Sequence, residues 1–113
     1  MSIKIYHNPR CSKSRQALGI IRDQSIEPDI IEYLKTPLNI DDLRKLIDAL
    51  NLTPKDVIRK CEQVYKDLNL KTASDDTLVK AIAENPILLE RPIVHTNKGA
   101  RIGRPPENIK EIL

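Results

Sequence analysis

The sequence predicts an α/β fold in which helices flank a four-stranded mixed sheet. Three observations predict it: alternating apolar residues near the N-terminus, helical spacing of apolar residues in the middle of the chain, and two further short strand-like runs joined by an Asn-Lys-Gly turn. At 113 residues the chain has the size of one domain, so we expect a single domain over residues 1–113.

The first third of the chain predicts a βαβ unit. Residues 2–6 (SIKIY) alternate apolar and polar side chains, which is typical of a short strand. Asn8-Pro9 indicates a loop, and residues 12–24 then place apolar side chains on one helical face. Residues 29–33 (DIIEY) form a second strand. A strand, a helix and a strand in this order make a right-handed crossover, so the two strands should pair in parallel.

The middle of the chain predicts helices. Asn39 and Ser74 are expected N-caps, because their side-chain oxygens can accept hydrogen bonds from N–H groups of the first turn. Thr53-Pro54 also begins a helix, since proline is favoured at the first helical position. The expected helices are residues 39–50, 53–59 and 74–85. Residues 65–70 are expected to form a turn or a short helical piece.

The C-terminal part predicts a hairpin and a helix. Residues 92–96 (PIVHT) and 100–102 (ARI) are short strands, and Gly99 in the loop between them can adopt a positive φ. Pro105-Pro106 opens a terminal helix. The complete order, β-α-β, helices, β-β-α, matches the thioredoxin-like fold with a helical insertion between the βαβ unit and the ββα unit.

The sequence does not have the features of a nucleic-acid-binding protein or of a membrane-spanning protein. The net charge is +3, from 19 basic and 16 acidic residues that are interleaved, and the chain has no Trp or Phe, so nucleic-acid binding is not indicated. No apolar run approaches the roughly 20 residues needed to cross a bilayer. The N-terminus lacks the pattern of a signal peptide. We therefore expect a cytoplasmic protein that binds neither nucleic acid nor membrane.

Cys11 lies where the first loop delivers the chain to the first helix. A thiol at a helix start faces unpaired backbone N–H groups and the positive end of the helix dipole, which lower its pKa below the usual value of about 8.5. His7, Arg10 and Arg15, when charged, would lower it further. The sequence therefore predicts a reactive thiolate; the alternative is a buried, inert cysteine.

The Cys11 motif contains no second thiol in Cys-x-x-Cys spacing, because Ser14 occupies that position. A disulfide within the loop and a Cys-x-x-Cys zinc pair are both excluded. The site is therefore a monothiol site, or it resolves through a cysteine elsewhere.

Three arginines in separate segments are candidates for holding an anion: Arg59, Arg91 and Arg104. Each alone is typical of a solvated surface residue. Arg91 and Arg104 each precede a proline, which holds the residue before it extended and restricts where its side chain can point. Spacing alone does not show that the three arginines meet.

Residues 6–15 (YHNPRCSKSR) resemble the opening motif of the glutaredoxin-dependent arsenate reductases, the ArsC family. The resemblance covers nearly the whole chain in the family's order. Its further blocks are residues 33–37 (YLKTP), 58–60 (IRK), 85–88 (NPIL), 90–94 (ERPIV) and 101–105 (RIGRP).

The resemblance implies roles for the residues around the first loop. Cys11 would be the catalytic cysteine, and His7 the histidine held to favour its thiolate. Ser14 and Arg15 would be the Ser-Arg pair of the anion loop, which also stabilises the thiolate.

The resemblance also implies an oxyanion site and a reaction. Arg59, Arg91 and Arg104 would hold the oxyanion, and Pro92 would be the cis-proline beside the active cysteine. The Cys11 thiolate would displace an arsenate oxygen to form a thiol-arsenate adduct. Glutathione would attack this adduct as co-substrate, and glutaredoxin would carry the electrons onward so that arsenite is released. Neither a metal nor a bound cofactor is implied, and we expect a monomer.

Two other functions stay open at this point. One is an Spx-like redox-responsive regulator that binds RNA polymerase, and the other is an ArsC-like domain that binds glutathione without reducing arsenate. Ser14 in place of a second cysteine, together with the complete arginine set, favours the enzyme. Cys61 could resolve an adduct on Cys11, but we favour a partly buried thiol at the end of a helix, because a monothiol site that uses glutathione needs no resolving cysteine.

Overall fold

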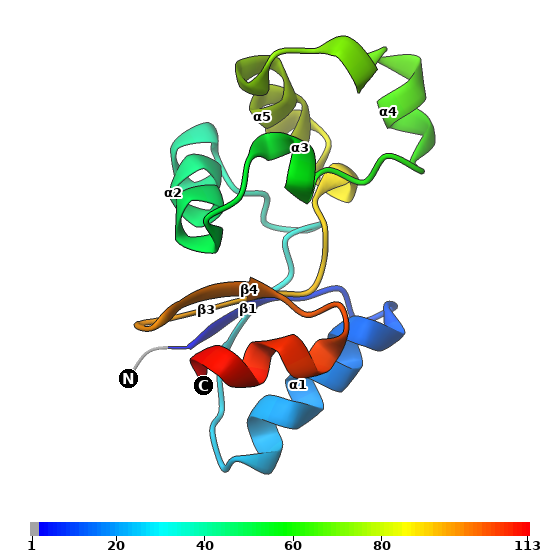
Figure 1. Ribbon diagram of the computed structural model, residues 1–113. Helices are drawn as coiled ribbons and strands as arrows, with labels where there is room; N and C mark the ends of the chain where they lie inside the picture. The colour runs from blue at the N-terminus through cyan, green and yellow to red at the C-terminus, as the bar shows by residue number, and fades with distance from the viewer. Residues whose placement is uncertain (1–2) are drawn as a thin grey trace. The chain divides into compact units, whose positions relative to one another are not determined.

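A four-stranded mixed sheet, in the order β2-β1-β3-β4, organises the first of two structural units in the chain (Figure 1). The computed structural model describes residues 3–113, and this unit contains the residues up to Thr36 together with Arg91–Leu113. β1 pairs in parallel with β2, while β3 pairs antiparallel with β1 and β4, which confirms the predicted thioredoxin-like sheet. The elements of the unit are β1 (Lys4–Tyr6), α1 (Ser12–Asp23), β2 (Asp29–Ile31), β3 (Ile93–Thr96), β4 (Gly99–Ile102) and the 3₁₀-helix η3 (Pro106–Ile112).

The second strand is shorter than the sequence predicts. It ends at Ile31 rather than at residue 33. The chain turns there because the backbone N–H groups of Lys35 and Thr36 both donate to the Glu32 carbonyl, at 2.9 and 3.0 Å. In the first predicted strand, Ser2 lies outside the described residues, and β1 begins at Lys4.

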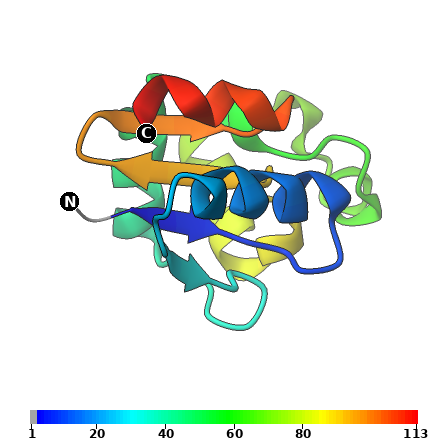
Figure 2. The same ribbon diagram turned by 90° about the horizontal axis from the view of Figure 1, so that it is seen from below.

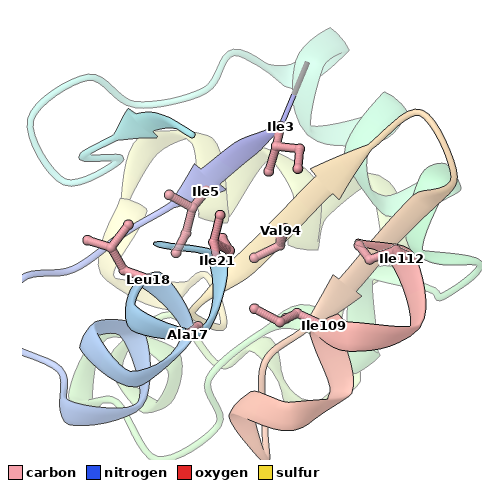
Figure 3. Packing of buried hydrophobic residues seen from close by; sticks show 8 residues of the cluster. All are labelled: Ile3, Ile5, Ala17, Leu18, Ile21, Val94, Ile109 and Ile112. Atoms are coloured by element: carbon pink, nitrogen blue, oxygen red, sulfur yellow. The ribbon is translucent and has the colours of Figure 1, made fainter. Parts of the chain in front are cut away.

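The core of this unit lies between one face of the sheet and the helices α1 and η3. Figure 2 shows the two helices side by side over the strands, and Figure 3 shows the side chains that fill the space between them. Burial of an apolar side chain of this size stabilises a fold by about 1.5–3 kcal/mol, so this packing fixes the position of α1 and of the residue at its start. The core residues are Ile3, Ile5, Ala17, Leu18, Ile21, Val94, Ile109 and Ile112.

Gly103, which joins β4 to η3, is tightly packed against Pro92. A Cβ atom at Gly103 would lie 2.8 Å from Pro92 Cγ and 3.4 Å from Ile109 Cγ2. Because the proline ring cannot rotate away, we expect Gly103→Ala to lower the free energy of unfolding by about 1–3 kcal/mol in urea titrations. The matched control is Gly19→Ala in α1, where no atom lies within 4 Å of the new Cβ. The free energy of unfolding of Gly19→Ala should rise by about 0.5–1 kcal/mol, because alanine has a higher helix propensity than glycine. Equal stability of the two variants would contradict the packing described.

The second unit, Pro37–Glu90, is helical, which confirms the predicted helical insertion. Asn39 Oδ1 accepts a hydrogen bond from the Asp42 N–H at 2.8 Å, and Ser74 Oγ accepts one from the Thr77 N–H at 3.3 Å, so both predicted caps are present. The elements are α2 (Ile40–Leu50), α3 (Pro54–Val57), α4 (Gln63–Asp67), η1 (Leu70–Thr72), α5 (Asp75–Glu84) and η2 (Pro86–Leu88).

The third helix ends earlier than predicted, at Val57 rather than near Arg59. Beyond it, the backbone is extended and pairs with the segment before Arg91. The Arg59 N–H donates to the Leu88 carbonyl at 2.7 Å, and the Glu90 N–H donates to the Val57 carbonyl at 2.8 Å. This pairing holds Arg59 next to Glu90.

No helix within residues 3–113 is both long enough and apolar enough to span a membrane. That the two units together form the single domain expected over residues 1–113 stays a prediction.

Candidate active site

Cys11 is the N-cap residue of α1, with an extended backbone (φ −93°, ψ 123°). Its N–H donates to the Asn8 carbonyl at 3.0 Å, which closes the loop before the helix. Its carbonyl accepts from the Arg15 N–H at 3.0 Å and so begins the helical hydrogen bonds. The sulfur is therefore held at the open N-terminal end of a helix that is anchored by the core.

The surroundings of Cys11 favour its thiolate. Partial burial raises the pKa of the thiol, but the Ser14 N–H, the Arg91 charge, the Lys13 N–H and the Arg104 charge together lower this pKa below its ordinary value. Hydrogen bonds and positive charges act in this way because they stabilise only the ionised form. A larger fraction of the thiol is then ionised near neutral pH, and the thiolate is the nucleophilic form of cysteine.

Arg104 links two parts of this site. Its Nη2 lies 3.7 Å from Cys11 Sγ, and its Nε donates to the Arg91 carbonyl at 2.8 Å. The Arg91–Pro92 bond is cis, as the resemblance implies, and the Arg104–Pro105 bond is cis as well. The sequence reasoning missed the second cis bond, because any bond before proline has the same low prior of being cis. Two of the three expected arginines thus act on the Cys11 sulfur.

Arg59 belongs to the second unit, and its guanidinium is engaged by carboxylates. Nη1 lies 2.7 Å from Glu62 Oε1, and Nε lies 3.8 Å from Glu90 Oε1. The side chain is only 16% exposed, so these ion pairs are partly shielded from water. The sequence reasoning missed both glutamates; their only signal was closeness in the sequence to Arg59 and Arg91. Convergence of Arg59 with Cys11 stays a prediction.

His7 does not provide positive charge to the thiol at neutral pH. Burial lowers the pKa of His7; Glu32 opposes this shift, while the Arg22 and Arg15 charges add to it, so the ring is mostly neutral at pH 7. Its Nδ1 is joined to Ser14 Oγ by a hydrogen bond of 2.6 Å. A cationic His7 was expected to lower the pKa of Cys11 through its charge, but His7 instead acts on this pKa indirectly, through Ser14. His7 holds the residue whose N–H lowers the pKa of Cys11.

Ser14 is fully buried and fixes the loop around the thiol. Besides its bond to His7, Ser14 Oγ accepts from the Asn8 N–H at 3.1 Å. Arg15 serves the same loop, because its Nη1 donates to the Pro9 carbonyl at 2.8 Å. Within residues 3–113, the Arg15 guanidinium is not among the groups that shift the pKa of Cys11. Ser14 and Arg15 thus shape the loop rather than add charge at the sulfur.

Cys61 is a free, exposed thiol in the second unit, and Cys11 is also free. The expected partial burial of Cys61 is therefore wrong, and whether Cys61 resolves an adduct on Cys11 stays a prediction. Within the described residues, no cluster of three or more His, Cys, Asp or Glu side chains could hold a metal ion.

Comparison with known proteins identifies relatives of the whole chain. The model of the ArsC family matches residues 6–112. YfgD of Escherichia coli K12 is 46% identical over 114 residues, which cover 98% of this chain and 96% of YfgD. The arsenate reductase of Neisseria meningitidis strain MC58 is 43% identical, over 98% of this chain and 97% of that protein. Among solved structures, an arsenate reductase from Vibrio cholerae is 48% identical and superposes with a TM-score of 0.96, covering 100% of this chain and 98% of the other.

Proposed function

Since the chain belongs to the ArsC family, we propose that it reduces arsenate to arsenite, with Cys11 as the attacking nucleophile. The observation that carries this proposal is the arrangement at α1, where Arg104 Nη2 lies 3.7 Å from a thiol whose pKa is lowered by Arg91, Arg104 and two backbone N–H groups. Thiolate and arsenate are both negative, so attack requires positive charge around the sulfur. Arginine provides it, because its planar group binds tetrahedral oxyanions and stays charged at neutral pH.

The first chemical step is a substitution without redox change. The Cys11 thiolate forms a bond to arsenic, and an As–O bond breaks as that oxygen leaves as water after protonation. Arg91 and Arg104 stabilise the remaining oxygens, and we propose Arg59 as a third ligand. To bind the oxyanion, the Arg59 guanidinium would have to give up its ion pair with Glu62 or with Glu90.

The reducing equivalents come from two further thiols. Glutathione displaces a second arsenate oxygen as water and forms a second S–As bond. A glutaredoxin thiolate then attacks the glutathione sulfur, the S–As electron pair stays on arsenic, and As(V) becomes As(III). The two sulfurs end as a mixed disulfide, and hydrolysis of the Cys11–As bond releases arsenite. We propose that glutathione and glutaredoxin act in this way as co-substrate and partner, with no bound cofactor.

The proposed setting is the cytoplasm, because the two free thiols and the need for glutathione both suit a reducing compartment. We propose that the protein acts as a monomer, since the thiol and two of its arginines come from one unit of one chain.

Steady-state arsenite production tests the function. We expect turnover of arsenate with both glutathione and glutaredoxin, and no more than a single turnover when either is omitted. Glutathione binding without arsenite production would contradict the proposal and indicate instead a glutathione-binding domain of this family. Turnover driven equally well by thioredoxin alone would overturn the choice of glutaredoxin but not the role of Cys11.

A further inference from the structure

Three lysines surround a cavity of about 360 Å³ that lies wholly within the second unit. Lys55 lies in α3, Lys60 follows that helix, and Lys71 lies in η1. All three are exposed, and none forms an ion pair within residues 3–113. No acidic side chain lines the cavity, although the charge of Lys60 also interacts with the Asp56 carboxylate, which lies outside the lining.

The rest of the cavity wall is apolar. Ile58, Leu70 and Leu78 are buried, with 5%, 3% and 1% of their surfaces exposed, and the half-buried ring of Tyr65 completes the wall. Lysine stems often cover apolar surface and leave no space above it. Here an open volume remains, and it falls within the range of about 300–1,000 Å³ that is usual for small-molecule sites.

We propose that this cavity binds a small organic anion with an aromatic or branched apolar body. The body would pack on Ile58, Leu70 and Leu78, and its carboxylate or comparable charged group would lie among the lysines. Each half of the wall selects for one property of the ligand. An inorganic oxyanion would gain nothing from the apolar wall, and a neutral hydrophobic molecule would gain nothing from the lysines.

This site goes beyond the proposed function. None of its seven lining residues belongs to the group around Cys11 that carries the arsenate chemistry. Binding at the cavity and reduction of arsenate can therefore be measured separately, and failure of one does not imply failure of the other.

The test is titration of the full ¹⁵N-labelled chain, followed by amide chemical shifts, with three probes: 2-naphthoate, the neutral 2-naphthylmethanol and inorganic phosphate. We expect 2-naphthoate to shift amides of residues 55–60, 65–71 and 78. Its Kd should be at least about three times lower than that of the alcohol, because each exposed pair of carboxylate and lysine adds a modest amount to the binding free energy. Phosphate should leave the amides of residues 65–71 and 78 unshifted; residues 58–60 are left out of this comparison, because Arg59 is proposed as an oxyanion ligand. Equal affinity for naphthoate and the alcohol, or shifts confined to residues near Cys11, would overturn the proposal, and so would the absence of binding.

Matched lysine variants provide the second arm. Lys55→Gln combined with Lys71→Gln should weaken 2-naphthoate binding about three- to tenfold and leave the affinity for the alcohol unchanged. Lys45→Gln combined with Lys80→Gln is the control, since these lysines are exposed in the same unit but do not line the cavity. Equal weakening by both pairs would reduce the effect to net charge and overturn the proposed site.

Discussion

Replacing Cys11 with Ser is expected to reduce arsenite production by roughly a thousandfold or more, to the background level. The hydroxyl has nearly the size of the thiol, so α1 and its loop should be retained. At neutral pH, however, the N–H groups and arginines that ionise a thiol cannot ionise a serine hydroxyl, and the nucleophile is lost. The measurement is arsenite production at saturating glutathione and glutaredoxin.

The control for this variant is Cys61→Ser, which replaces an exposed thiol in the second unit. We expect it to keep wild-type activity, because glutathione takes the place of a resolving cysteine. Loss of activity in Cys61→Ser would show that Cys61 resolves the adduct. Substantial activity in Cys11→Ser, with its fold confirmed by circular dichroism, would remove Cys11 from the mechanism.

Arg104→Ala is expected to lower kcat/KM for arsenate by about tenfold or more. A charge-assisted hydrogen bond contributes about 1.5–3 kcal/mol, and about 1.4 kcal/mol corresponds to a factor of ten. The variant removes the contact at 3.7 Å to Cys11 Sγ and the hydrogen bond at 2.8 Å to the Arg91 carbonyl. The pKa of Cys11 should rise only in part, because the Ser14 N–H and the Arg91 charge remain.

Two further variants give this prediction its controls. Arg104→Lys should recover only part of the loss, because an ammonium group cannot form two parallel hydrogen bonds to an oxyanion. Arg101→Ala removes a nearby arginine that pairs instead with Glu111 at 3.0 Å, and it should keep wild-type kcat/KM. If Arg101→Ala lost as much activity as Arg104→Ala, the effect would be one of general charge or stability rather than of the site.

Local patterns were sufficient to predict most elements of the fold. The apolar alternation before Tyr6, the caps at Asn39 and Ser74, and the turn that ends at Gly99 (φ 132°) all lie where they were expected. What local patterns missed depends on long-range pairing. The third helix ends at Val57 because the Arg59 N–H bonds to the Leu88 carbonyl, and that contact has no local signature.

The site was predictable to different degrees for different residues. The position of Cys11 at a helix start followed from the sequence, because a helix N-terminus can be recognised locally. The approach of Arg91 and Arg104 to the sulfur had only the family resemblance to indicate it. The neutral state of His7 could not be predicted, since it results from burial. Residue types and their order reveal little about burial at one position.

The central claim, that the surroundings of Cys11 lower the pKa of its thiol, is tested most directly by iodoacetamide alkylation of the native protein as a function of pH. The modified cysteine is assigned by mass spectrometry at each pH. Because only the thiolate reacts, the rate at Cys11 should reach half its maximum below the usual thiol pKa of about 8.5, and Cys61 should react more slowly near pH 7. A Cys11 midpoint at or above that usual value, or faster alkylation of Cys61 near pH 7, would contradict the account.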